Sequence, residues 1–192
     1  MSSALSTLLT RILALDAAMV DLVLAIRHPV VTKLMTSVTG LGSASAVVVF
    51  LGLCHVAGWR RELRVGAIAM LCSGVVVVSL MALVQRPFPP QPVCLTDGTG
   101  VAPHSFPSGH AAAVTVYALV ARESTRLPGG VVAGLAALVA FSRIYLGTHY
   151  LSDTVVGVVI GVGAFLAATR ALDRDGWPAL DGTGLLSLGR RR

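Results

Sequence analysis

Long apolar segments alternate with short polar connections along most of the chain. The clearest of them, residues 65–84, reads VGAIAMLCSGVVVVSLMALV and has no charged residue. A helix of about 20 such residues is long enough to cross a bilayer. Four further segments are rich in Val, Ala, Leu and Gly: residues 41–57, 108–124, 129–147 and 154–169. The pattern predicts an all-α fold, a polytopic membrane helical bundle with five or six transmembrane helices.

The N-terminal apolar segment, residues 8–26, differs from the others because it contains charged residues. It is long enough to be a sixth span, but Arg11, Asp16 and Asp21 interrupt it and would each be costly at the bilayer centre. An amphipathic helix in the membrane interface is the alternative. We therefore expect amphipathic or membrane-entry helices in residues 1–40, a transmembrane domain in residues 41–170 and a basic tail in residues 171–192.

The charge distribution indicates how the chain crosses the membrane. Only 12% of the residues are charged, against roughly 25% in a typical soluble domain. The net charge of +6 comes from short connections and the tail rather than from a soluble surface, so we expect no nucleic-acid partner. WRRELR (residues 59–64), Arg122, Arg126 and the tail are predicted to be cytoplasmic. The loop at residues 85–107 and the turn near Thr148 then emerge on the extracytoplasmic side.

The remaining ionisable and special residues meet at that extracytoplasmic face. Each has a simple explanation by itself: an arginine extending to the interface, a hydrogen-bonded histidine, or an aspartate at a helix start. Together, two arginines, two histidines and a carboxylate at one depth indicate an anionic ligand and proton transfer. The predicted cluster consists of Arg86, Ser108, His110, Arg143, His149 and Asp153.

The residue types in this cluster suit a phosphate group. Arginine forks match phosphate oxygens, and the helix that starts near Gly109 offers backbone N–H groups to an anion. His149 and Asp153 are four residues apart, so on a helix the carboxylate could hold one ring nitrogen and leave the other free for attack. His110 could protonate the leaving oxygen, and the two histidines suit a phosphohistidine mechanism. We expect no metal or other cofactor, because the arginines would repel a cation.

Three motifs resemble those of a known family. They are RP at residues 86–87, PSGH at residues 107–110, and SR at residues 142–143 followed by His149 and Asp153. This combination resembles the type 2 phosphatidic acid phosphatase superfamily, and it is similar to small bacterial polyprenyl-diphosphatase-like members. The resemblance implies hydrolysis of a phosphate ester or anhydride on a membrane lipid. It also implies that His149 is the nucleophile, Asp153 orients it, His110 is the acid, and Arg86, Arg143, Ser108 and the Gly109 amide bind phosphate.

The chain departs from the family's pattern at one position. The family usually has a lysine seven residues before the position of Arg86, and Ser79 stands there in this chain. Gln85 or His104 could lend another donor, although neither supplies a fixed positive charge. Three functions stay open on this evidence. They are a phosphatase of a polyprenyl diphosphate or phosphorylated polyprenyl carrier in the bacterial inner membrane, a phosphatidylglycerophosphate or phosphatidic acid phosphatase, and a weakened lipid-binding or transport homologue.

Overall fold

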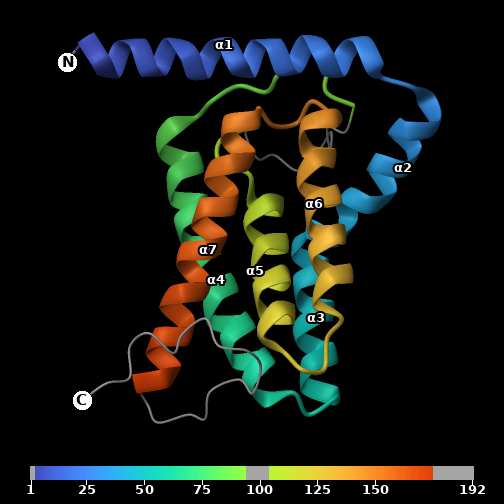
Figure 1. Ribbon diagram of the computed structural model, residues 1–192, viewed down its shortest axis with the longest axis vertical. Helices are drawn as coiled ribbons and strands as arrows, with labels where there is room; N and C mark the ends of the chain where they lie inside the picture. The colour runs from blue at the N-terminus through green and yellow to red at the C-terminus, as the bar shows by residue number, and fades with distance from the viewer. Residues whose placement is uncertain (1–2, 94–103, 175–192) are drawn as a thin grey trace.

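The computed structural model describes residues 3–93 and 104–174, and the prediction of an all-α membrane bundle is confirmed for them (Figure 1). The predicted basic tail lies outside the described residues from position 175 onward. The described elements, in chain order, are α1 (Ser3–Ile26), α2 (Pro29–Thr39), the short 3-10 helix η1 (Gly40–Gly42), α3 (Ala44–Val56), α4 (Arg60–Val84), α5 (Gly109–Glu123), α6 (Gly129–Tyr145) and α7 (Leu151–Arg174).

Helix α5 lies at the centre of the bundle, and α4, α6 and α7 pack around it (Figure 1). Its Val116 and Val120 are almost fully buried, together with Ala69 of α4 and with Phe165 and Ala168 of α7. Many of these side chains are small, which lets neighbouring backbones approach closely within a membrane. The most buried helix therefore begins with the PSGH motif.

Two glycines set the distance between α5 and α7. A Cβ atom at Gly157 would collide with the backbone oxygen of Ser108, and one at Gly161 would lie 2.6 Å from the oxygen of Ala112. By contrast, nothing lies within 4 Å of the corresponding position at Gly163. Gly157 and Gly161 thus face α5 and allow the start of α5 to lie directly against the first turns of α7.

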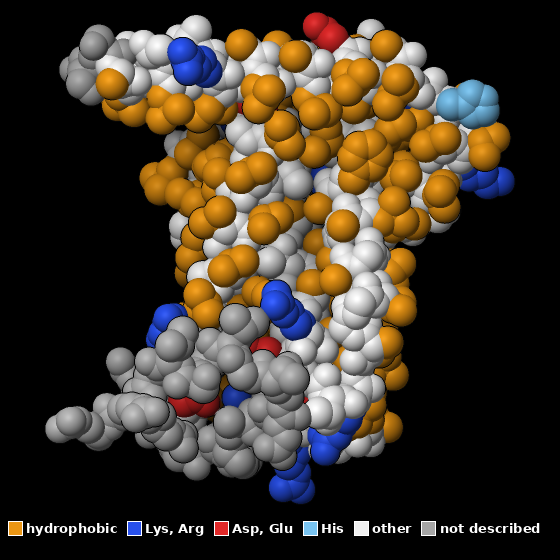
Figure 2. All heavy atoms as spheres, in the orientation of Figure 1, with side chains coloured by type: hydrophobic (Ala, Val, Ile, Leu, Met, Phe, Trp, Pro, Cys, Tyr) orange, Lys and Arg blue, Asp and Glu red, His pale blue; other side chains and the backbone are white. Residues whose placement is uncertain are grey.

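The lengths and surfaces of the helices fit a bilayer. By length and composition, α4 and α7 can each cross a membrane, and α2–η1 together with α3 forms a pair that passes the same test with a bend of 55°. Helix α6 is shorter and also apolar. Figure 2 shows hydrophobic side chains over the flank of the bundle, with most of the basic side chains in this view towards the end away from α1.

One predicted boundary is wrong. Residues 59–64 were expected to form a loop, but α4 begins at Arg60, so the arginines of WRRELR occupy its first turns. In the same turns Glu62 is buried, where it accepts a hydrogen bond from the Ser124 hydroxyl at 2.7 Å and lies 3.6 Å from Arg126. Ser124 and Arg126 supply one hydrogen bond and a positive charge to this buried carboxylate, which lets it lie within the helix instead of in a solvated connection.

Helix α1 lies across one end of the bundle instead of running parallel to the other helices (Figure 1). It ends at Ile26, and the next two residues attach it to the end of α6 and to the segment after α4. Arg27 donates to the backbone oxygens of Gln91 at 2.9 Å and Tyr145 at 3.2 Å, and the His28 amide donates to the Tyr145 hydroxyl at 2.9 Å. These bonds hold α1 over the end at which α4 finishes and α5 and α7 begin.

Candidate active site

Arg86 lies two residues after the end of α4 and reaches the start of α7. Helix α4 ends at Val84, and Gln85 takes a left-handed conformation with φ 47°, which turns the chain. The Arg86 Nη1 atom donates to Oδ1 of Asp153 at 2.6 Å and to the Ser152 hydroxyl at 2.8 Å. Its guanidinium also lies 3.8 Å from the centre of the Tyr150 ring. The RP motif and the third motif are therefore in direct contact, as the sequence predicts for one cluster.

The PSGH motif forms the start of α5. Ser108 is the N-cap residue, and its fully buried hydroxyl accepts a hydrogen bond from the Ala111 amide at 3.3 Å. The Ser108 amide donates to the backbone oxygen of Asp153 at 3.1 Å, which fixes α5 against α7. Gly109 and His110 are the first residues of the helix, where backbone N–H groups lack partners within the helix and favour an anion.

His110 is held by a close contact with the 3-10 helix η1. A Cβ atom at Gly42 would lie 2.9 Å from both Cβ and Cδ2 of His110 and 3.1 Å from Val139. Only a glycine lets η1 lie against the histidine ring without displacing it. The half-buried imidazole therefore has a fixed position one residue inside α5.

The connection between α6 and α7 folds around the backbone oxygen of Arg143. This oxygen accepts the amides of Thr148 and His149, both at 3.2 Å, and the Thr148 hydroxyl at 3.1 Å. The Arg143 side chain extends to the end of α2, where Nη1 donates to the Thr39 hydroxyl at 2.8 Å. Arg143 and His149 thus come from one rigid turn.

The nucleophile candidate has a different partner from the one expected. We expected Asp153 to hold a ring nitrogen of His149, but Nδ1 of His149 forms a hydrogen bond with the backbone oxygen of Ser105. The Asp153 carboxylate instead accepts from Arg86 and, at 2.9 Å, from the Tyr150 amide. The reason is that α7 begins at Leu151, so His149 precedes the helix and the four-residue spacing does not stack the two side chains.

The environment of His149 determines its protonation. Burial, and next the nearby Arg143 guanidinium, lower the pKa of His149 to about 3, although the hydrogen bond to Ser105 acts in the opposite direction. The ring is therefore neutral at pH 7. A carbonyl oxygen only accepts hydrogen bonds, so Nδ1 carries the proton and the lone pair of Nε2 is available.

The three auxiliary candidates lie outside this network of contacts. Ser79 is exposed on α4, and Gln85 is exposed and donates to the oxygen of Ala82 in its own helix at 3.1 Å. His104 is half-buried just before Ser105. A role for any of them in binding phosphate stays a prediction.

Asp16 and Ser152 complete the cluster, and the sequence did not single them out as site residues. Asp16 of α1 is 3% exposed, and its Oδ2 atom lies 2.8 Å from Nη2 of Arg86 and 2.6 Å from the Ser152 hydroxyl. A carboxylate in an apolar segment is itself a signal of a functional site. Its partners are far away in the sequence, so the signal does not reveal what the carboxylate contacts. Among the described residues, no group of three or more His, Cys, Asp or Glu is placed to hold a metal ion.

The comparisons with known proteins agree with the fold and the motifs. Residues 65–177 match the model of the PAP2 superfamily. The chain is 36% identical over 122 residues to a Mycobacterium tuberculosis protein named decaprenylphosphoryl-5-phosphoribose phosphatase, a match that covers 62% of this chain and 68% of the relative. A protein of the same name from Mycolicibacterium smegmatis is 35% identical over 51% of this chain and 53% of the relative.

Two solved structures have the same fold. The crystal structure of Aquifex aeolicus LpxE has a TM-score of 0.69 and 25% identity, covering 80% of this chain and 94% of that one. A transmembrane PAP2-type phosphatidylglycerolphosphate phosphatase from Bacillus subtilis also has a TM-score of 0.69, with 21% identity, covering 90% of this chain and 88% of that one. With the matched family model and the named relatives, these findings show that the chain belongs to the PAP2 superfamily and is a membrane lipid phosphatase.

Proposed function

We propose that this protein removes a terminal phosphate from a phosphorylated polyprenyl carrier lipid at the extracytoplasmic face of the bacterial inner membrane. The observation that carries the proposal is the neutral His149, with Nε2 available, at the same end of the bundle as Arg86 and Arg143. The relatives named decaprenylphosphoryl-5-phosphoribose phosphatase support a prenyl lipid.

The reaction begins with attack of the Nε2 lone pair of His149 on phosphorus. The bond between phosphorus and the leaving oxygen breaks, and His110 in its imidazolium form gives a proton to that oxygen and becomes neutral. General acid catalysis of this kind contributes typically about 10²- to 10⁴-fold. The Ser105 carbonyl accepts the hydrogen bond from Nδ1–H throughout, so it stabilises the positive charge that the ring acquires on phosphorylation.

The positive and polar groups bind the phosphate oxygens. Arg86 and Arg143 supply guanidinium N–H groups, and the start of α5 supplies the Gly109 amide and the Ser108 hydroxyl. Water then attacks the phosphorus of the phosphohistidine, its proton goes to the neutral His110, the bond between phosphorus and Nε2 breaks, and inorganic phosphate leaves with both histidines restored. Asp153 serves this site by fixing Arg86 and the Tyr150 amide, because these are its contacts. We propose no metal ion in either step.

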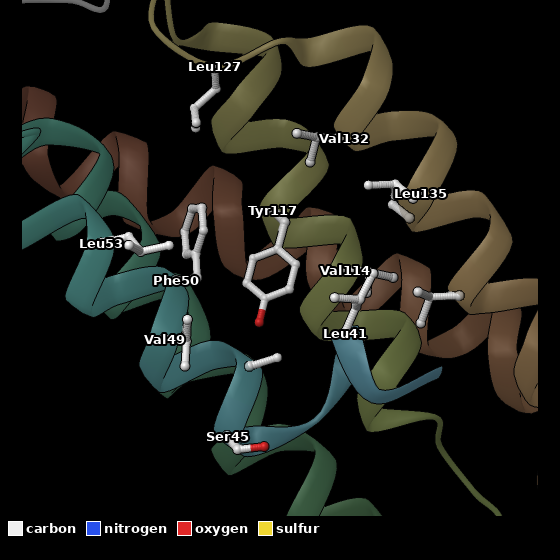
Figure 3. Close-up of a pocket in the computed structure, with 13 residues that line it drawn as sticks. Leu41, Ser45, Val49, Phe50, Leu53, Val114, Tyr117, Leu127, Val132 and Leu135 are labelled. Atoms are coloured by element: carbon white, nitrogen blue, oxygen red, sulfur yellow. The ribbon is translucent and has the colours of Figure 1, made fainter. Parts of the chain in front are cut away.

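An apolar pocket of about 480 Å³ between α3, α5 and α6 suits the hydrocarbon chain of the substrate (Figure 3). Its lining includes Leu41, which is next to Gly42, and Val114, which is one helical turn after His110. Val139, which Gly42 also approaches, belongs to the same lining. The pocket therefore starts beside His110. Because the oxygen that His110 protonates is attached to the lipid, the hydrocarbon chain of the substrate would extend from that oxygen into the pocket.

The placement of the basic residues supports the extracytoplasmic side. Arginines of the first turns of α4 and of the α5–α6 connection lie at the end opposite the site, and such residues favour the cytoplasmic face. Helix α1 would then lie in the outer interface, because exposed leucines and isoleucines line much of its length. We propose that the site faces the extracytoplasmic side and that α1 lies in the outer interface.

A second candidate substrate is a diacyl lipid phosphate. Figure 3 shows Phe50 and Tyr117 facing one another in the pocket, with ring centres 4.7 Å apart. Within the described residues the buried Tyr117 hydroxyl has no hydrogen-bond partner. It could donate to an ester carbonyl, which a diacyl lipid has near its phosphate and a prenyl chain lacks. The Tyr117→Phe variant separates the candidates: turnover of prenyl substrates stays unchanged, and a selective loss with diacyl substrates would favour the diacyl lipid.

The pocket can be tested by filling it. The Val114→Trp variant should raise KM for a long-chain prenyl phosphate and leave kcat/KM for a short-chain, water-soluble phosphate ester close to wild type. Val131 of α6 is 61% exposed and does not line the pocket, so Val131→Trp is the matched control. An equal loss with both substrates in Val114→Trp would contradict a role for the pocket in holding the chain.

A further inference from the structure

Asp16 is a buried carboxylate on a helix whose neighbouring side chains are exposed. Leu13 and Leu15 are 59% and 57% exposed, whereas Asp16 is 3% exposed. Helix α1 lies across one end of the bundle (Figure 1), and the Asp16 carboxylate contacts Arg86 and Ser152 there. Removing a carboxylate from water is costly unless it is paired and hydrogen-bonded. The burial of Asp16 therefore depends on the partners that it meets at the start of α7.

Those partners belong to the active site. Oδ1 of Asp16 accepts the Ser152 amide at 2.9 Å, and Oδ2 accepts the Ser152 hydroxyl at 2.6 Å and Nη2 of Arg86 at 2.8 Å. Ser152 is the second residue of α7, where a negative charge satisfies an unpaired amide and the helix dipole. One carboxylate thus fixes the start of α7 and the Arg86 guanidinium together.

Arg86 is held from two sides as a result. Asp16 binds Nη2, while Asp153 and Ser152 bind Nη1, and the flat face of the guanidinium lies over Tyr150. A guanidinium has five N–H donors, and the three hydrogen bonds leave donors for a phosphate. A long flexible side chain is in this way restricted to one orientation before the substrate arrives.

We infer that Asp16 is a positioning residue for the phosphatase reaction, and that it acts through Arg86. The inference rests on the proposed role of Arg86 in binding the substrate phosphate. Asp16 itself contacts Arg86 and Ser152, so its effect on turnover is transmitted by the orientation of the guanidinium. The N-terminal helix is therefore part of the catalytic architecture through one side chain.

The first test compares two aspartates of α1 in detergent, with farnesyl phosphate as the substrate. Asp16→Asn keeps the size of the side chain and removes the charge that holds Nη2. We expect kcat/KM to fall by about 10- to 100-fold, the scale seen when a reacting group is misplaced by about 1 Å. Asp21→Asn changes an exposed aspartate of the same helix and should leave kcat/KM at the wild-type value. An unchanged kcat/KM in Asp16→Asn overturns the inference.

A double-mutant cycle with Arg86→Lys separates positioning from a general structural role. Lysine lacks the fork that Asp16 orients, so Asp16→Asn should cause little further loss in the Arg86→Lys background. Loss by the same factor in both backgrounds would mean that Asp16 acts independently of Arg86, and it would overturn the inference. The thermal unfolding midpoint of each variant shows whether it is folded.

A second variant keeps the test decisive if Asp16→Asn does not fold. Ser152→Ala removes a hydroxyl that contacts both Asp16 and Arg86 and changes no charge. It should lower kcat/KM in the wild-type background and cause little further loss in the Arg86→Lys background. If the wild-type protein leaves farnesyl phosphate intact, the prenyl proposal fails. The cycle is then measured with dioctanoyl phosphatidic acid, so the two failures are distinguishable.

Discussion

Nδ1 of His149 and the backbone oxygen of Ser105 form a hydrogen bond that joins two segments 44 residues apart in the chain. Ser105 precedes the PSGH motif, and His149 follows α6, so the contact brings the nucleophile candidate to the start of α5. A backbone carbonyl cannot be protonated at neutral pH, which fixes the tautomer of the ring more firmly than a titratable partner would. The availability of Nε2 therefore follows from the fold of the loop before α5.

The depressed pKa of His149 predicts acid sensitivity of the folded state. In the unfolded chain the ring titrates near 6.5, whereas in the folded protein it stays neutral down to about pH 3. Stability from this group is thus fully present above pH 6.5 and is lost as the pH falls from 6.5 towards 3. Between pH 7.5 and pH 5 the loss should be about 2 kcal/mol.

Thermal unfolding in detergent at these two pH values measures this effect. The His149→Asn variant should lose less stability on acidification than the wild-type protein, because asparagine takes up no proton. His55 lies near the opposite end of the bundle, at the end of α3, and is exposed, so His55→Asn is the control and should behave as the wild type. Equal acid sensitivity of all three proteins would contradict a neutral, buried His149.

The close contact between α5 and α7 predicts that adding one methyl group at Gly157 strongly lowers activity. Gly157→Ala should lower kcat/KM by at least about tenfold, because its Cβ atom would push α7 away from Ser108 and so displace the phosphate-binding start of α5. Gly163→Ala places the same group in open space and should leave activity unchanged. Phosphate release from the substrate at several concentrations gives both values, and a Gly157→Ala enzyme with wild-type kcat/KM would show that α5 and α7 need not touch here.

Hydropathy was sufficient to predict most of the bundle. The uncharged segment 65–84 forms the greater part of α4, and the segment 129–147 corresponds to α6. The boundary at Arg60 could not be predicted, because the partner of the buried Glu62 is Ser124, the C-cap residue of α5, which is 62 residues away in the chain. Periodicity within a segment does not report such long-range partners.

The site residues were easier to predict than their contacts. Arg86, Ser108 and His149 belong to recognisable motifs, and the packing of the helices brings those motifs to one end of the bundle. The partner of His149 was predicted wrongly because the sequence does not show whether a helix begins before or after that residue. Asp16 was read as an interruption of an apolar segment, since its partners Arg86 and Ser152 are 70 and 136 residues away.

Ser79→Lys tests whether the phosphate site lacks the positive charge of the family's usual lysine. If the site lacks only one positive charge, the variant should lower KM for phosphate esters or extend the range of lipid phosphates that are cleaved. Ser79 is exposed on α4, so a lysine there has room to extend. The measurement is phosphate release from polyprenyl monophosphate, polyprenyl diphosphate, phosphatidylglycerophosphate and phosphatidic acid. Loss of all activity in a folded Ser79→Lys protein would mean that the phosphate site is built differently around this position.

The reaction should need no divalent ion. Arg86 and Arg143 supply the positive charge that a metal would otherwise provide, so kcat should be the same with and without EDTA in the assay. Readdition of Mg²⁺ or Zn²⁺ to chelated enzyme is the control. A chelator that abolishes turnover, with recovery on adding the metal, would contradict the proposed mechanism.

Release of inorganic phosphate from purified protein tests the central claim most directly. The assay contains detergent and EDTA and offers a polyprenyl monophosphate, a polyprenyl diphosphate, phosphatidylglycerophosphate and phosphatidic acid, with His149→Ala as the control. We predict release by the wild-type protein, fastest from the polyprenyl monophosphate, and none by folded His149→Ala. Release that persists in His149→Ala would contradict the assignment of His149 as the nucleophile, and no release from any lipid by the wild-type protein would contradict the proposed function.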